Sequence, residues 1–272
     1  WIRVKRGQIV PRNFGDELNI YLLKGLTGCP LHIYNSRFHR CKQNFVVVGS
    51  LIDGFIDEKS IIWGSGIRTG KRELPFLPKE VLAVRGRLTR DFLLERGVSC
   101  PEVYGDPALL MPLVYTPKID KKYKVGIIPH YRDIHLTKVQ DFIQNNKKSA
   151  KLIRFDKYDD WHSVIDEICQ CEYIVSSSLH GLILADAYNI PNLWIELSSN
   201  IKEGHFKYLD YFSGVGRVDS SPYLFLGDES VDFIVDELKS YHTINFDKES
   251  LLSACPFNIK SEFILHIENQ RQ

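Results

Sequence analysis

Apolar residues follow two alternating patterns along this chain. Short, nearly continuous apolar runs are typical of strands that are covered on both faces of a parallel sheet. Such runs lie at residues 45–49, 61–63, 80–86, 124–131, 152–155, 173–175 and 193–196, after a short β-like start at residues 1–10. Elsewhere, apolar residues recur at helical spacing near residues 18–23, 89–94, 136–143, 161–168, 182–187, 231–238 and 248–270. Strands that alternate with helices predict an α/β protein with parallel sheets.

The stretch from Pro112 to Lys124 interrupts this alternation with two prolines and several charged residues, which indicates a linker. The two sets of strands and helices on either side predict two doubly wound, Rossmann-like domains, at residues 1–115 and 116–272. Their strand ends would face each other across a cleft. The last helical region is broken at Cys255-Pro256 and could pack back on the first domain.

The stretch from Tyr173 to Glu196 is the most informative part of the chain. A strand ends in three serines, a helix follows with His180 near its start, and Pro191 ends that helix before the next strand. In parallel sheets the strand ends and helix N-termini face the ligand, and the backbone N–H groups there favour anions. We therefore expect Ser176, Ser177, Ser178 and His180 to lie where an anionic substrate is held. The alternative for His180 is a ring that is satisfied by backbone groups.

Four further residues carry candidate chemistry. Arg85 ends a predicted strand, where it could bind phosphate or carboxylate bidentately. It could equally form a surface or interdomain ion pair. His130 occupies the corresponding place after the strand at 124–131. Asn13 and Asp16 lie at the start of the first helix, which either can cap.

Composition narrows the functional class. The net charge of +1 gives no support for nucleic-acid binding, and no apolar run approaches the roughly 20 residues that span a bilayer. The basic start, Arg3, Lys5 and Arg6, is expected to be a solvated face, with peripheral membrane contact as the alternative. The six scattered cysteines are typical of reduced thiols in a cytoplasmic protein, and we expect no metal site.

Several short motifs occur in an order that resembles the polysaccharide pyruvyltransferase family. They are Asn13-Phe14-Gly15-Asp16, Gly64-Ser65-Gly66-Ile67, Val84-Arg85-Gly86 with Thr89, Tyr104-Gly105-Asp106-Pro107-Ala108, Ser177-Ser178-Leu179-His180-Gly181 and Ala185-Asp186-Ala187-Tyr188-Asn189-Ile190-Pro191. The Ser-Leu-His-Gly segment with its tail is the most specific of them. The resemblance spans about residues 10 to 215.

This resemblance implies a two-domain fold of the GT-B type, as in many glycosyltransferases. It also implies transfer of a pyruvyl group from phosphoenolpyruvate, the donor substrate, to two hydroxyls of a sugar, with no further cofactor. The family's donor-binding Arg and His would correspond to Arg85 and His180, both taken as catalytic. The residues around His180, namely Ser177, Ser178, Leu179 and Gly181, would complete the donor site.

The sugar acceptor is less well defined by the sequence. Asp16, His130 and Lys207 are candidates to contact it, and it could be presented on a lipid-linked oligosaccharide. Lys207 belongs to a segment, residues 202–217, where charged and aromatic side chains suit either sugar binding or packing at a domain boundary. We interpret that segment as a loop with a helical turn.

Two other functions remain open at this point. A nucleotide-sugar glycosyltransferase of the same architecture would also place an anion at a helix N-terminus, and binding of UDP, GDP or CMP would favour it. A non-catalytic carbohydrate- or phosphate-binding protein could keep the same fold. Ligand-induced stabilisation without product would favour that second alternative.

Overall fold

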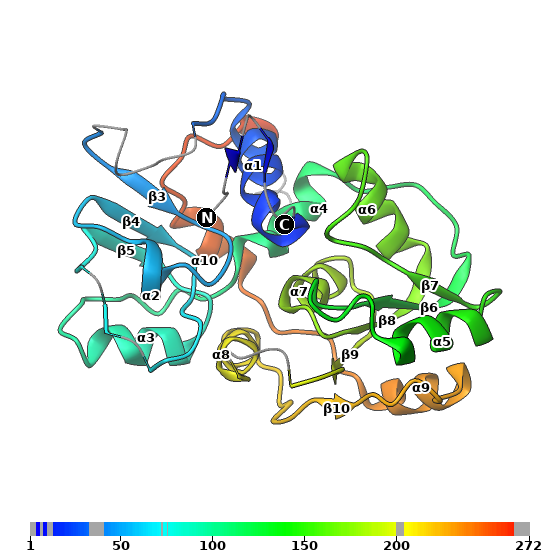
Figure 1. Ribbon diagram of the computed structural model, residues 1–272. Helices are drawn as coiled ribbons and strands as arrows, with labels where there is room; N and C mark the ends of the chain where they lie inside the picture. The colour runs from blue at the N-terminus through cyan, green and yellow to red at the C-terminus, as the bar shows by residue number, and fades with distance from the viewer. Residues whose placement is uncertain are drawn as a thin grey trace.

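The computed structural model describes residues 4–5, 8–9, 13–32, 41–71, 73–74, 76–199 and 204–263. Within these ranges the chain forms two separate parallel sheets and an additional two-stranded pair (Figure 1). The predicted α/β class with parallel sheets is therefore confirmed. Arg3 and Arg6 of the basic start, and residues 264–270 of the last predicted helix, lie outside the described residues.

The smaller parallel sheet has the order β3-β4-β5 and lies in the first half of the chain. Its strands are β3 (Asn44–Val46), β4 (Ser60–Trp63) and β5 (Glu80–Ala83), while β1 (Val4–Lys5) and β2 (Gln8–Ile9) form the antiparallel pair. All four residues of β4 are buried, as expected for a central strand that is covered on both faces.

The larger sheet has the order β10-β9-β8-β6-β7, and all of its neighbouring strands pair in parallel. Its strands are β6 (Tyr123–Ile128), β7 (Ala150–Leu152), β8 (Cys171–Ser176), β9 (Asn192–Glu196) and β10 (Tyr223–Leu224). The edge strand β10 has only two residues and was not expected from the apolar pattern. The carboxyl ends of β6 and β8, which are neighbours, lead into the loops that carry His130 and Ser178.

Helices connect and cover these strands. They are α1 (Phe14–Thr27), α2 (Ile52–Phe55), α3 (Arg87–Leu94), α4 (Met111–Val114), α5 (Thr137–Asn145), α6 (Trp161–Cys169), α7 (Leu179–Ala187), α8 (Phe206–Val215), α9 (Val231–Glu237) and α10 (Lys248–Ser253), with 3-10 helices η1 (Pro107–Leu110) and η2 (Leu238–Ser240). Figure 1 shows the smaller sheet on the left, the larger sheet on the right, and α1, α4 and α7 between them.

One segment differs from its sequence-based prediction. Residues 202–217 were expected to form a loop with a helical turn, but residues 206–215 form the ten-residue helix α8. Tyr208, Tyr211, Phe212 and Val215 recur at helical spacing and are all buried, so they give this helix a complete apolar face. Gly216, with φ 71°, provides the left-handed residue that ends it.

The largest buried apolar cluster draws on both halves of the chain, with Trp63, Leu110 and Leu182 among its members. The segment after α9 also returns to the smaller sheet. The indole Nε1 of Trp63 donates a hydrogen bond of 2.9 Å to the backbone oxygen of Leu251 in α10. Hydrophobic burial therefore joins the two sheets, and the domain limits at residues 1–115 and 116–272 stay a prediction.

Candidate active site

The turn between β8 and α7 is built by serine hydroxyls. The Ser176 hydroxyl donates to the backbone oxygen of Ile128 at 2.9 Å and accepts from the backbone N–H of Ser178 at 3.0 Å. The Ser177 hydroxyl accepts from the backbone N–H of His130 at 2.9 Å, which ties the loop after β6 to the start of α7. Ser176 and Ser177 are fully buried, so they shape this turn from inside.

Ser178 is the N-cap residue of α7, with extended backbone angles and no side-chain capping hydrogen bond. Its hydroxyl is therefore not used to cap the helix. Ser178, Leu179 and His180 line a pocket of about 300 Å³. Because the first N–H groups of an α-helix lack intrahelical acceptors, this end of α7 is suited to an anion.

The same pocket is lined by three other predicted site residues. Asp16 from α1, His130 from the loop after β6 and Lys207 from α8 all line it. The predicted residues Arg85, Ser177 and Gly181 do not. Gly181 packs against Ser176, whose hydroxyl oxygen a Cβ atom at position 181 would overlap. Six of the nine predicted site residues thus line one pocket. Ser177 and Gly181 do not line it, but they shape the turn between β8 and α7.

His180 faces a buried carboxylate. Its Nε2 atom lies 4.0 Å from Oδ2 of Asp106, and among the described residues neither atom has a hydrogen-bond partner. Asp106 begins η1, where its other oxygen, Oδ1, accepts from the backbone N–H of Ala108 at 3.0 Å. Backbone groups therefore do not satisfy Nε2 of His180, in contrast to the alternative considered from the sequence.

The opposite edge of the imidazole lies against α1. A Cβ atom at Gly15 would overlap Nδ1 of His180, so only glycine allows this approach. Gly15 stands in the chain close to Asn13 and Asp16, which both line the pocket. Nε2 of His180 thus points toward the buried Asp106, and Nδ1 lies beside Gly15 of α1.

Burial changes the proton affinity of both partners. It lowers the pKa of His180 to about 3, and the positive charges of Arg85 and Lys207 act in the same direction. Burial also raises the pKa of Asp106 to about 6, although the Ala108 N–H and Arg85 oppose that rise. At neutral pH, therefore, His180 is a neutral imidazole, and Asp106 loses its proton only near pH 6.

The carboxyl group of Asp16 stands at the pocket beside a cation. Burial raises the pKa of Asp16, while the hydrogen bond from Asn13 (3.2 Å) and the charge of Lys207 oppose the rise. Asn13 is also the N-cap of α1, because its side-chain oxygen accepts from the backbone N–H of Gly15 at 3.2 Å. Asn13, and not Asp16, is therefore the capping residue of this helix.

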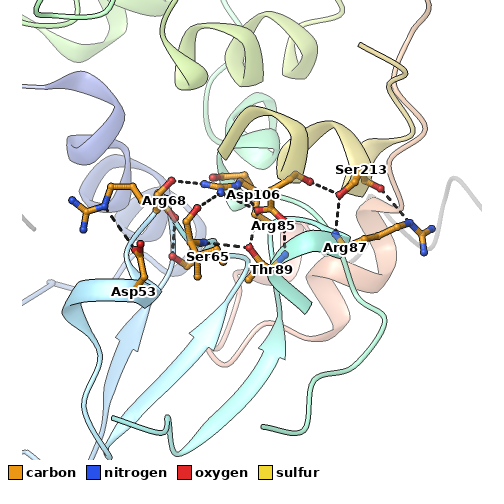
Figure 2. A network of polar contacts seen from close by, with 12 residues as sticks. Asp53, Ser65, Arg68, Arg85, Arg87, Thr89, Asp106 and Ser213 are labelled. Carbon is orange, nitrogen blue, oxygen red and sulfur yellow. Dashed lines mark hydrogen bonds and ion pairs between the residues drawn. The ribbon is translucent and has the colours of Figure 1, made fainter. Parts of the chain in front are cut away.

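Arg85 does not line the pocket and is completely buried. Figure 2 shows it at the centre of a network of polar contacts. Its Nε and Nη2 atoms each lie 2.9 Å from Oδ2 of Asp210. Its Nη1 atom donates to the Ser50 hydroxyl at 2.6 Å, and Nη2 donates to the backbone oxygen of Ile67 at 2.7 Å. This is the ion-pair alternative raised for Arg85, in a buried form, and Arg85 reaches the pocket only through Ser50, which lines it.

Close packing of α8 on α3 creates this ion pair. A Cβ atom at Gly86 would collide with the backbone oxygen of Asp210, and one at Gly214 would collide with the backbone oxygen of Arg85. Asp210 also accepts hydrogen bonds from the N–H and the hydroxyl of Thr89, at 2.7 and 2.8 Å. The two glycines let the backbones approach closely enough for the pair to form.

Arg68 is a pocket residue that sequence reasoning missed. It follows the Gly64–Ile67 run directly, and its side chain reaches the pocket wall. Asp106 was also missed as a site residue, although it stands within the Tyr104–Ala108 motif. Asp106 could have been found as an acidic residue within one of the ordered motifs. Nothing in the residues around Arg68 indicated that its side chain points to the pocket.

A family model described as polysaccharide pyruvyl transferase matches residues 12–199, more than half of the chain. The chain belongs to this family. The resemblance stated from the sequence motifs is thereby confirmed. The matched region contains Asp106, His180 and every pocket residue except Lys207, which follows it in α8.

Two curated relatives extend the comparison. The chain is 27% identical over 277 residues to "Uncharacterized protein L143" of Acanthamoeba polyphaga mimivirus, with 92% of each chain covered. It is 29% identical over 210 residues to the succinoglycan biosynthesis protein ExoV of Rhizobium meliloti. That alignment covers 75% of this chain and 62% of the relative.

The described part of the chain also gives information on metal sites, membrane-spanning helices and other hollows. There, no three His, Cys, Asp or Glu side chains gather in a way that could hold a metal ion, and the six cysteines are free thiols. None of the described helices is both long and apolar enough to span a bilayer. Another hollow, of about 400 Å³ at residues 77–81 and 97–99, contains none of the predicted site residues.

Proposed function

We propose that this protein transfers a pyruvyl group from phosphoenolpyruvate to two hydroxyls of a sugar and thereby forms a cyclic ketal. Membership of the polysaccharide pyruvyl transferase family supports pyruvyl transfer, and the relative named for succinoglycan biosynthesis supports a role in polysaccharide assembly. The observation that carries the proposal is the position of His180. It lies at the anion-favouring start of α7, on a pocket wall, with Asp106 behind it.

The donor carries a phosphate and a carboxylate, so its site needs hydrogen-bond donors and positive charge. In the proposed arrangement Ser178, Leu179 and His180 bind it at the start of α7. Ser177 and Gly181 hold the shape of that turn. All described contacts of Arg85 are with protein groups. Arg85 is therefore proposed to act on the donor through its positive charge, without direct contact.

Ketal formation requires two kinds of proton transfer. A proton is added to the methylene carbon of phosphoenolpyruvate, which makes C2 electrophilic, and a sugar hydroxyl loses its proton as its oxygen attacks C2. Phosphate then leaves as the second hydroxyl attacks the same carbon, so the products are the ketal and inorganic phosphate. His180 is our candidate for the general acid at the pocket, since histidine can exchange protons near neutral pH.

The low pKa of His180 makes its protonation dependent on the donor. Without nearby anions the ring is neutral, because burial disfavours its charged form. The negative charges of a bound donor favour the imidazolium and raise that pKa. Below about pH 6 Asp106 keeps its proton. That proton can pass to Nε2 once the 4.0 Å separation between the two atoms shortens on substrate binding.

The sugar acceptor is proposed to contact Asp16, His130 and Lys207 on the same pocket. A carboxyl, an imidazole and an ammonium group can hydrogen-bond to sugar hydroxyls. The acceptor is a sugar of a growing polysaccharide, presented free or on a lipid carrier to a cytoplasmic enzyme that meets membranes only peripherally. The proposed reaction uses phosphoenolpyruvate as a substrate and requires no separate cofactor.

The two sheets are proposed to belong to two Rossmann-like domains, with a boundary near residue 115, that meet as in GT-B enzymes. The origin of the pocket residues supports this arrangement. Asp16 and Arg68 come from the first half of the chain, whereas His130, His180 and Lys207 come from the second. Ligand sites at the junction of two α/β units are common, because the strand ends converge there.

The first experiment is a thermal-shift screen of the wild-type protein with phosphoenolpyruvate, UDP, GDP and CMP, followed by phosphate-release assays with candidate sugars. We expect stabilisation by phosphoenolpyruvate, and acceptor-dependent phosphate release that His180→Ala abolishes without unfolding the protein. Stabilisation by a nucleotide alone would replace this proposal with a nucleotide-sugar glycosyltransferase. Near wild-type turnover by His180→Ala would remove His180 from its proposed role.

A further inference from the structure

A donor with two anionic groups needs more than the start of one helix, and Arg85 is committed to protein partners. We propose that Arg68 binds one of the two oxyanion groups of the donor, its phosphate or its carboxylate, through the terminal nitrogens of its guanidinium. This inference rests on the proposed function, because it assigns a residue to the donor of that same pocket.

The guanidinium of Arg68 is anchored but not saturated. Its Nε atom lies 3.7 Å from Oδ1 of Asp53, beyond hydrogen-bond distance, and its side chain is 25% exposed. Nε has no hydrogen-bond partner among the described residues. The central carbon of the guanidinium lies 5.4 Å from the centre of the Phe55 ring. Figure 2 shows the side chain extending away from Arg85, with a dashed line to Asp53.

The carboxylate of Asp53 keeps the guanidinium of Arg68 at the pocket wall. The side chain of Asp53 is fully buried, and neither of its oxygens accepts a hydrogen bond from a described residue. A buried carboxylate is costly unless a positive charge lies close to it, so Asp53 holds Arg68 at the pocket wall. Gly54 leaves room for this position, since a Cβ atom there would lie only 3.0 Å from Nη2 of Arg68.

The chemistry of the guanidinium matches that of the donor. A planar fork of N–H donors can bind the two oxygens of a phosphate or carboxylate at once, which a lysine cannot do. The pocket also has Lys207 on its wall, and the pKa of its acidic residue, Asp16, is raised by burial. An anion that enters the pocket therefore meets Arg68 on the side of the smaller sheet and the start of α7 on the other.

Calorimetric titration with phosphoenolpyruvate, inorganic phosphate and pyruvate tests this inference. Because Arg68→Ala alone would strand the buried Asp53 charge and could unfold the protein, we would compare Asp53→Asn/Arg68→Ala with Asp53→Asn, and Arg68→Lys with wild type. Arg96→Ala is the matched control. Arg96 is 24% exposed, lies over Phe92, and has an Nε without a described hydrogen-bond partner, but it does not line the pocket.

We expect the double variant to bind phosphoenolpyruvate at least about tenfold more weakly than Asp53→Asn, as for loss of hydrogen bonds to a charged group. Arg68→Lys should lose less, and Arg96→Ala should bind as wild type does. Whichever of phosphate and pyruvate loses binding in the double variant identifies the group that Arg68 holds.

Equal binding of phosphoenolpyruvate by the double variant and Asp53→Asn would overturn the role of Arg68 and leave the proposed function standing. If wild type binds phosphate or pyruvate through Arg68 but not phosphoenolpyruvate, the anion site is supported and the proposed donor is wrong. If wild type binds none of the three, both the inference and the proposed function are overturned.

Discussion

The imidazole Nε2 of His180 points at the buried Oδ2 of Asp106 across 4.0 Å, and neither atom has a hydrogen-bond partner among the described residues. Buried polar atoms without partners are uncommon in folded proteins and cost free energy. Two such atoms that face each other beside a pocket are typical of a site where a proton moves. The carboxyl group of Asp106 is fully buried, so a proton from it would reach the pocket through the imidazole of His180.

Asp106→Asn tests that relationship directly. The amide has nearly the same shape but cannot release a proton, so we expect turnover to fall by about a hundredfold, within the usual range for a lost proton-transfer group. Because the pKa of Asp106 is raised to about 6, wild-type kcat/KM should fall as the pH rises through 6 and Asp106 loses its proton. The variant should lack that limb of the pH profile.

Asp133→Asn is the control for this substitution. Asp133 is also completely buried, and it accepts a hydrogen bond of 2.6 Å from Ser198, but it does not line the pocket. The control should show the wild-type pH profile in whatever fraction of protein is folded. If Asp106→Asn and wild type share one pH profile, Asp106 has no part in the proton transfer.

The depressed pKa of His180 predicts a specific loss of stability in acid. Below the ordinary histidine pKa the unfolded chain binds a proton that the folded His180, with a pKa of about 3, does not bind. The free energy of unfolding should therefore fall as the pH drops from about 6.5 toward 3, by at most about 1.4 kcal/mol per pH unit from this residue.

Urea denaturation of wild type and His180→Gln between pH 7 and pH 4.5 measures this effect. Glutamine does not titrate, so the wild type should lose stability relative to the variant as the pH falls. The protonation of groups that do not contact His180 is common to both proteins and largely cancels in the difference. Repeating the comparison with Asp106→Asn present in both proteins removes the titration of the neighbouring carboxyl. A difference that stays constant with pH would mean that His180 is protonated as easily in the folded chain as in the unfolded one.

Gly15→Ala should impair turnover by displacing the imidazole. The new Cβ atom would overlap Nδ1 of His180, so the ring must move, while alanine itself is favourable in a helix. We expect kcat to fall by about tenfold to a hundredfold, as misplacement of a reacting group by about 1 Å can do. Steady-state kinetics together with a melting curve would separate this from unfolding.

Gly25→Ala is the matched variant in the same helix. There the new Cβ atom would overlap the side chain of Val114, away from the pocket. Overpacking of this kind costs about 1–3 kcal/mol of stability. Gly25→Ala should therefore melt earlier but keep its turnover, and the reverse pattern in the two variants would refute the proposed contact between Gly15 and the reacting ring.

Arg85→Ala should act mainly on stability. It would leave the buried carboxylate of Asp210 without its counter-charge, which typically costs about 3–5 kcal/mol. Arg87→Ala provides the comparison, because Arg87 is exposed and bonds to Ser213 across the same contact between α3 and α8. Its loss should cost about 1 kcal/mol or less.

Urea denaturation of the two arginine variants measures that difference. A fully stable Arg85→Ala protein that no longer binds phosphoenolpyruvate would instead support the donor-binding role that the sequence suggested for Arg85, which follows β5.

Local sequence was sufficient to predict the fold class and to select several candidate residues that lie together. The alternation of apolar runs and helical spacing predicted the parallel α/β class, and the serine turn placed His180 at the start of α7. Asp16, His130 and Lys207, which are far apart in the chain, were all predicted for the site and do line one pocket with His180. These residues meet at one pocket because strand ends and helix starts in parallel sheets converge on one edge, so position in the pattern implies position in space.

Local sequence alone therefore determined the fold class, the family motifs and the edge at which the candidate site residues gather. Only the tertiary structure decided which charged groups reach the pocket and which are buried. Arg85 and Asp210 are separated by 125 residues and meet because α8 packs on α3, whereas Arg68 turns toward the pocket beside Asp53. Packing of η1 on α7 brings Asp106 to His180, where the carboxyl group is fully buried and the imidazole is mostly buried at the pocket wall. Burial and long-range charge set the pKa values of these groups, and neither is encoded in the pattern of neighbouring residues.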